Sequence, residues 1–313
     1  QAAWRLQQMI KASGWPLAPE AFAPGAHYSA KLEGGLVPFH WACQHGKDSL
    51  VKHMIEHGAN VQDRTERGVS GSERPLVIHN MLRLIDAREG AGSTAEELAK
   101  LVYTDNPGVV TRYALQLKAL AKDAKTAPVK RSAFAMLVFA SRSPDAIWAE
   151  NVSDGGQLNY LVESIALIPA NEAALRSKFQ PHLTALLNEG KINGGRLRAV
   201  LTALPLMGAD NAAANFQIVA QHLIDGKERN AAAKALLKFP KASWDSAKAK
   251  PITDAVLAYG KNVKPADRSK PEYVEIIAAA KEMAVLQGDA GKATLAELKT
   301  ISVDVFVVHT VHE

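Results

Sequence analysis

Cysteine is nearly absent from this chain of 313 residues, which contains only Cys43. A single thiol cannot form an internal disulfide, supply a four-cysteine zinc site or provide the paired cysteines that attach a c-type haem. These three features are therefore excluded within the printed residues. The same observation says little about the cellular compartment.

Aromatic residues and long apolar runs are scarce as well. Aromatics make up 6% of the residues, and no stretch reaches the roughly 18 consecutive apolar residues of a membrane span. Alanine and leucine are plentiful, which suits helices that pack closely through small side chains. The chain begins at Gln1 and has no recognisable signal peptide. We expect a soluble, mostly helical piece of a longer protein.

The charge is mild, with a formal net value of +5. The lysines are spread along the chain, whereas a nucleic-acid groove needs a concentrated basic stripe with stacking aromatics. We therefore expect proteins or neighbouring domains as partners, and no nucleic acid.

From about Arg74 onward, apolar residues recur at the three- and four-residue spacing of helices, interrupted every 15 to 20 residues. Some interruptions combine proline or glycine with a capping residue, as at Ser143-Pro144 and Asn193-Gly194-Gly195. The pattern predicts an α-solenoid of two-helix units of roughly 35 to 40 residues. The predicted helices span 74–88, 94–102, 107–123, 127–140, 143–150, 156–168, 171–188, 193–207, 211–225, 227–238, 243–260 and 270–287.

Two other segments flank this array. Residues 1–34 combine a short helical pattern with a proline- and glycine-rich linker, and 35–73 form a compact unit followed by a polar turn. The array itself is assigned to 74–299. Residues 301–308 alternate with the two-residue period of a strand, so 300–313 are predicted to begin a truncated β domain.

The stretch GLVPFHWACQHGKDSLVKHMIEHGANVQD, residues 35–63, resembles one ankyrin repeat. The resemblance implies that Pro38 and His40 shape the start of a first helix and that Gly58 and Ala59 end a second. The other matching positions are Gly35, Phe39, Ala42, Gly46, Val51, Ile55 and Asn60.

A second resemblance extends from about residue 100 to the end. The segments NAAAKALLKFPKASWD (230–245), VKPADRSKPEYVEIIAAAKEMA (263–284) and LKTISVDVFVVHTVHE (298–313) resemble the HEAT-repeat region of multidomain planctomycete and verrucomicrobial proteins. Such proteins typically combine a dehydrogenase-like propeller, a cytochrome c segment and an azurin- or plastocyanin-like copper domain. The resemblance implies an exported, periplasmic electron-transfer parent. Copper or haem would lie in that parent, and no cofactor in this fragment.

His53, Glu56 and His57 spell the HxxEH pattern, which on a helix places two imidazoles one turn apart and can hold zinc. A catalytic zinc also needs a third ligand, and no residue is nominated for it. The same residues fall inside the ankyrin-like consensus, where Gly58 ends the helix at once. We therefore keep these three residues only as remote metal candidates.

The remaining polar candidates have structural explanations. His40 and Cys43 occupy structural positions of the ankyrin-like unit. His309 and His312 would point to opposite faces of the predicted strand, so they would not share a metal.

Two glycine-containing sequences, at 154–156 and 193–195, lack the strand and helix that would flank a phosphate loop, so they are interpreted as turns. We interpret five large aromatics as packing residues, a minority of which could line a binding face: Trp148, Trp244, Phe134, Phe139 and Phe239.

No residue pattern discloses a chemical activity. The leading hypothesis is a non-catalytic scaffold that holds neighbouring domains apart or offers a surface to a protein partner. A second hypothesis makes this region the docking part of a redox carrier or dehydrogenase. A third is a cytoplasmic ankyrin-type adaptor, and a metal hydrolase comes last.

Overall fold

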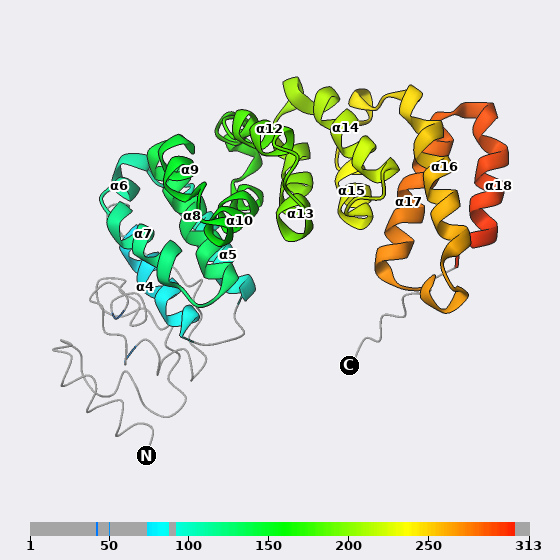
Figure 1. Ribbon diagram of the computed structural model, residues 1–313. Coiled ribbons are helices and arrows are strands. Elements are labelled where there is room, and N and C mark those ends of the chain that lie inside the picture. Colours follow the sequence, from blue (N-terminus) through cyan, green and yellow to red (C-terminus); the bar gives the residue numbers. More distant parts are fainter. Residues whose placement is uncertain (1–41, 43–49, 51–73, 88–91, 304–313) are drawn as a thin grey trace, which may run out of the picture. The chain divides into compact units, whose positions relative to one another are not determined.

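The computed structural model describes residues Ala42, Leu50, 74–87 and 92–303 (Figure 1). Within these ranges the chain forms fifteen α-helices, α4 to α18, joined by turns and short 3-10 helices, and it contains no strand. The all-α prediction is confirmed for this part of the chain. The described residues divide into two compact units, the first ending at Pro169 and the second starting at Ala170.

Unit 1 is built around one central helix, α8. This helix contacts five others of the unit, α4, α5, α6, α7 and α10. The helices of unit 1 are α4 (Arg74–Asp86), α5 (Gly92–Val102), α6 (Pro107–Thr111), α7 (Ala114–Asp123), α8 (Ala127–Ser141), α9 (Asp145–Asn151) and α10 (Gly155–Ser164).

The sequence of α8 explains its position, because its interior is apolar on every side. All residues from Ser132 to Ala140 are buried, and a helix that is apolar all round needs neighbours all round. Ser132 meets this environment by donating its hydroxyl to the carbonyl of Ala95 at 3.0 Å. Half-buried Arg131 contacts Glu96 on α5 at 2.6 Å and Glu163 on α10 at 3.0 Å, so it ties three helices together.

Unit 2 consists of successive antiparallel helices arranged in two rows. Helices α13, α15 and α17 contact one another in sequence, as do α14, α16 and α18, and each row packs on the other. The helices of unit 2 are α11 (Ala173–Ser177), α12 (Gln180–Asn188), α13 (Gly194–Ala203), α14 (Ala209–Ile224), α15 (Arg229–Leu236), α16 (Ser246–Asn262), α17 (Pro271–Leu286) and α18 (Gly291–Ile301).

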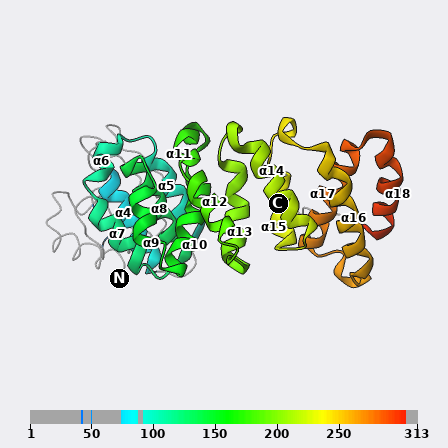
Figure 2. The same ribbon diagram turned by 45° about the horizontal axis from the view of Figure 1, so that its top comes forward.

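This arrangement is that of a helical repeat. Helices of the first row begin at Gly194, Arg229 and Pro271, so successive two-helix units are offset by 35 and 42 residues. The predicted repeat length of roughly 35 to 40 residues is close to both values. Figure 1 shows α16, α17 and α18 as neighbouring rods, and Figure 2 gives the same elements from a second direction.

Two helices predicted as continuous are interrupted. The segment 107–123 is split into α6 and α7 at Arg112 and Tyr113, where Tyr113 leaves the helical region with φ −105° and ψ 14°. Thr111 donates its hydroxyl to the carbonyls of Pro107 and Ala140, which fixes this corner against α8. The segment 171–188 is likewise divided, with a turn between α11 and α12.

The prediction of a strand from residue 300 onward is wrong for the residues that the structure describes. Ile301 ends helix α18, and Ser302 and Val303 follow it without strand structure. The sequence shows apolar alternation from Ile301, but Leu298 and Ile301 also have helical spacing, and both are buried against neighbouring helices. Tertiary packing thus selects the helix up to Ile301. The remaining predicted strand residues lie outside the described ranges.

Candidate interaction surface

Most residues proposed as chemical candidates lie outside the described ranges. This applies to His53, Glu56 and His57, and equally to His40, Cys43, His309 and His312. Of the ankyrin-like stretch, Ala42 and Leu50 are described, and both are helical and buried. Their burial agrees with a packed helical unit. Within the described ranges, no three histidine, cysteine, aspartate or glutamate side chains gather as metal ligands would.

The two glycine-containing sequences are helix starts. Asp154 accepts hydrogen bonds from the backbone amides of Gly156 at 3.0 Å and Gln157 at 3.1 Å, so it caps α10. Asn193 precedes α13, and Gly194 has a positive φ of 53°, which glycine adopts without strain. The sequence predicted turns at both places, whereas the glycines of both belong to the first turn of a helix.

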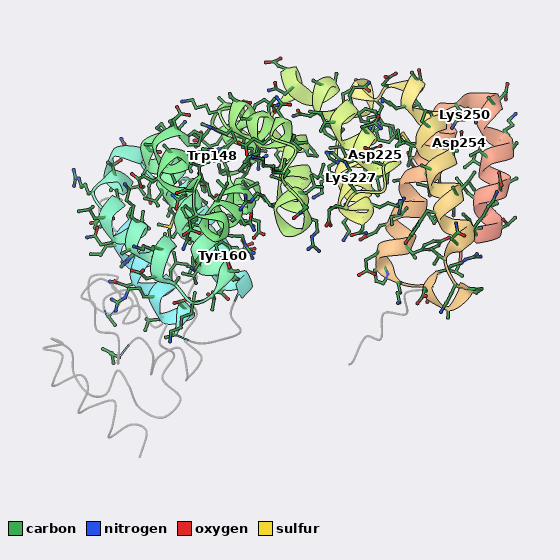
Figure 3. The ribbon with its side chains drawn as sticks, in the orientation of Figure 1. Trp148, Tyr160, Asp225, Lys227, Lys250 and Asp254 are labelled. Atoms are coloured by element: carbon green, nitrogen blue, oxygen red, sulfur yellow. The ribbon has the colours of Figure 1, made fainter. Side chains whose placement is uncertain are left out.

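The large aromatics mostly serve packing. Phe134, Phe139, Phe239 and Trp148 are buried, and Figure 3 labels Trp148 on α9. Trp244 is half-buried and donates its indole N–H to the carbonyl of Phe239 at 3.1 Å.

The outer face of the first row in unit 2 carries ion pairs that cross between repeats. Lys234 on α15 contacts Glu275 on α17 at 3.0 Å, and Lys241 contacts Glu282 at 3.0 Å. Glu275 and Glu282 lie seven residues, or about two turns, apart on α17, whereas Lys241 lies in the 3-10 helix that follows α15. Such exposed pairs contribute about 0–1 kcal/mol each, so they add little to the stability of the repeats.

Among the residues of these ion pairs, Glu275 has two side-chain partners, Asn230 and Lys234. Burial raises the pKa of its carboxyl, but hydrogen bonds from Asn230 and Lys234 outweigh burial and bring the pKa below its usual range. Asn230 also donates to the carbonyl of Glu272 at 3.1 Å. Three side chains from α15 and α17 are thus fixed to one another at the surface.

The second row is joined by similar polar contacts. Gln217 on α14 donates to Asp245 at the start of α16, and this bond, together with the amide of Ala247, lowers the pKa of Asp245. Lys261 on α16 contacts Glu297 on α18 at 2.6 Å. Another exposed pair of α16, Lys250 and Asp254, is labelled in Figure 3. Both rows therefore present a regular, charged surface.

His222, in the last turn of α14, has a lowered pKa. Burial lowers its pKa and Lys227 lowers it further, while Asp225 raises it. Figure 3 labels Asp225 and Lys227 in the turn that follows α14. The Nδ1 atom of His222 is buried without a hydrogen-bond partner. Both observations favour the neutral form of this histidine.

An apolar groove runs beside α17 at the last helix pair. It has a volume of about 110 Å³ and is lined by α17 residues including Val274, Ile277 and Lys281 and by Ser302 and Val303 after α18. A groove of this size is too small for most ligands of the kind that occupy pockets of about 300 Å³ or more. It can accept a few side chains of a protein segment.

No helix in the described ranges is both long and apolar enough to cross a membrane. The described surface thus offers charged rows, the small groove beside α17 and a more open hollow of about 410 Å³ between the end of α16 and the start of α17, which can support contact with proteins.

The comparisons with known proteins agree with part of the sequence analysis. The family model "Ankyrin repeat" matches residues 34–66, which confirms the resemblance of residues 35–63. No curated protein and no solved structure matches the chain. The matched segment is about a tenth of the chain, so the chain is similar to the ankyrin repeat family over this segment.

Proposed function

We propose that this chain is a non-catalytic helical-repeat scaffold for contact with a protein partner or with neighbouring domains. The observation that carries the proposal is the two-row array of α13 to α18, in which charged side chains recur at the surface. Repeat arrays extend a surface by adding units, without needing a larger core. The ankyrin match at residues 34–66 supports the same function class, because that family is built from stacked repeats.

A finer form of the proposal places the chain in an exported, periplasmic electron-transfer protein. It depends on the resemblance of residues 298–313 and two internal segments to the HEAT-repeat region of multidomain redox proteins. In this form the scaffold connects domains that carry copper or haem, and the fragment itself binds neither.

The alternative finer form is an ankyrin-type adaptor in the cytoplasm. The family match at residues 34–66 favours it, because ankyrin repeats normally occur in stacks of about three or more. Further ankyrin repeats before Gln1 would support this form, whereas a copper or haem motif after Glu313 would support the redox form. Reading the flanking coding sequence separates the two.

Chemical cross-linking tests the scaffold proposal itself. The natural protein, with whatever flanks this chain, is treated in its native extract with a lysine-reactive cross-linker and mapped by mass spectrometry. We expect Lys234, Lys238 and Lys241 to be linked to residues outside this 313-residue chain. Cross-links confined to the chain itself would contradict a scaffold role for this face. Links from Lys250 on the second row show whether that row is used as well.

A further inference from the structure

Asn193 is the only asparagine in the sequence that a glycine follows directly. Such a pair can react without an enzyme, because the backbone nitrogen of the glycine can attack the side-chain amide carbon of the asparagine and release ammonia. Glycine permits the attack, since it carries no side chain that would shield its nitrogen. The pair lies at the start of α13, the first helix of the first row in unit 2.

The side chain of Asn193 is available for this reaction. It is exposed, and within the described ranges its amide group makes no hydrogen bond, although it occupies the N-cap position of α13. At the same position of α10, Asp154 is fixed by the amides of two following residues at 3.0 and 3.1 Å. Three other asparagines each donate to the carbonyl four residues earlier, at 2.7 to 3.0 Å: Asn151, Asn211 and Asn262.

The backbone amide of Gly194 is available as well. It is the first amide of α13, for which the helix itself provides no carbonyl partner. It donates no hydrogen bond to any residue that the structure describes. Asn188, which is also exposed and ends α12, differs in this respect, because the amide of Glu189 after it donates to the carbonyl of Ala185 at 3.1 Å.

The surroundings leave room for the ring to close. A five-membered ring requires rotation about the Cα–C bond of Asn193, whose ψ is 176°. A methyl group built on Gly190, Gly194 or Gly195 would meet nothing within 4 Å. The backbone on both sides of the bond can therefore turn without a clash.

We propose that Asn193 is a site of spontaneous deamidation, which converts the start of α13 into a mixture of aspartate and isoaspartate. The Gly194 nitrogen loses its proton and bonds to Cγ of Asn193, while the Cγ–Nδ2 bond breaks and ammonia leaves. One water molecule then opens the cyclic imide. Attack on Cγ gives aspartate, and attack on the main-chain carbonyl carbon gives isoaspartate.

The two products act differently on α13. Aspartate is a good N-cap, and its negative charge is favoured at the start of a helix. Isoaspartate carries the main chain through Cβ and Cγ, so the carbonyl of residue 193 no longer lies where Leu197 donates its amide to it, at 3.4 Å. We expect the first turn of α13 to loosen. The inference goes beyond the scaffold proposal, because it holds whether or not the charged rows bind a partner.

Ageing of the 313-residue chain tests the proposal. The protein is kept at neutral pH and physiological temperature, and tryptic peptides 192–196 and 179–191 are compared with an unaged sample by mass spectrometry. We expect Asn193 to become acidic at least about tenfold faster than Asn188, a difference of about 1.4 kcal/mol in activation free energy. The rate should rise with pH, because base removes the proton from Gly194. Equal rates at the two asparagines would overturn the proposal.

Two variants separate the products. A protein-isoaspartate methyltransferase with a labelled methyl donor should label the aged chain more than aged Asn193→Gln, because glutamine cannot close the five-membered ring. Equal labelling would show that isoaspartate arises elsewhere. Hydrogen exchange at the start of α13 should be faster in the aged chain than in fresh Asn193→Asp, with α16 unchanged as the reference. Equal exchange in α13 would contradict the loosening of its first turn.

Discussion

His222, in the last turn of α14, shows how one buried ring couples stability to pH. Burial is the main cause of its lowered pKa. The unfolded chain therefore binds the proton more readily than the folded chain, and the free energy of unfolding falls as the pH decreases through the unfolded value near 6.5.

We predict that unfolding monitored by circular dichroism will show this loss between about pH 7.5 and 5. His222→Gln should flatten the dependence across that interval, because glutamine does not titrate. The two proteins should have parallel pH dependence above pH 8. An unchanged slope in the variant would assign the loss to other groups.

Asp86 acts at the same scale, by holding the beginning of another helix. It accepts hydrogen bonds from the amides of Lys125 and Thr126 and from the hydroxyl of Thr126, at 2.8 to 3.0 Å. These donors precede α8, where a helix leaves its first amides unpaired. Asp86 at the end of α4 thus supplies a cap from a distant part of the sequence.

We expect Asp86→Ala to lower the free energy of unfolding by about 1–2 kcal/mol, the usual effect of removing a helix cap. Urea denaturation followed by circular dichroism measures it. Asp123→Ala, at the exposed end of α7, is the matched control and should change stability by less than about 0.5 kcal/mol. Equal effects of the two substitutions would contradict the capping role.

At the scale of elements, the hairpin of α17 and α18 depends on a glycine at its turn. A methyl group built on Gly291 would lie 1.8 Å from the carbonyl oxygen of Ala284, which no packing arrangement tolerates. Gly260 has a related role on α16, where an added methyl group would meet Ile301 at 2.5 Å. Close approach of three helices thus depends on the absence of two side chains.

We predict that Gly291→Ala will destabilise the chain by about 1–3 kcal/mol, because backbone must move to admit the methyl group. Thermal unfolding measures the loss. Gly195→Ala is the control, since its added methyl group meets nothing within 4 Å. That variant should be neutral or slightly more stable, because alanine favours helix. A similar loss in both variants would indicate that the effect does not come from the α17–α18 turn.

Sequence patterns identify most helices but not the breaks between them. Regular apolar spacing predicted α8, α14, α16 and α17 within a few residues of their observed ends. The break at Arg112 and Tyr113 was missed, because Thr111 is fixed by the carbonyl of Ala140, a residue distant in the sequence. Helix α18 was also missed. Its buried residues are only Gly291, Leu298 and Ile301, and its packing against α16 and α17 is not visible in the local sequence.

For the whole molecule, the division at Pro169 and Ala170 implies that each unit has its own core. Unit 2 buries large side chains of its own, among them Phe179 and Phe216. We predict that residues 170–313, produced alone, will be helical by circular dichroism and will unfold in one cooperative transition. A spectrum without helix, or a gradual loss of helix on heating, would contradict an independent core.

The sequence predicted that the helix surfaces are charged, but not which ion pairs they form. Dispersed lysines predicted solvated helix faces, and Lys234, Lys241 and Lys261 are indeed exposed members of ion pairs. Which glutamate each lysine meets depends on the offset between α15 and α17, or between α16 and α18. That offset is set by packing and has no counterpart in local sequence.

The sequence by itself determined the all-α class and an approximate repeat length, because both follow from local spacing and turn residues. It also determined the ankyrin-like segment through its consensus positions. Only the tertiary structure decided that α8 is the centre of unit 1, that α18 ends at Ile301, and that a groove remains open beside α17. These features depend on contacts between residues far apart in the chain, which no local pattern encodes.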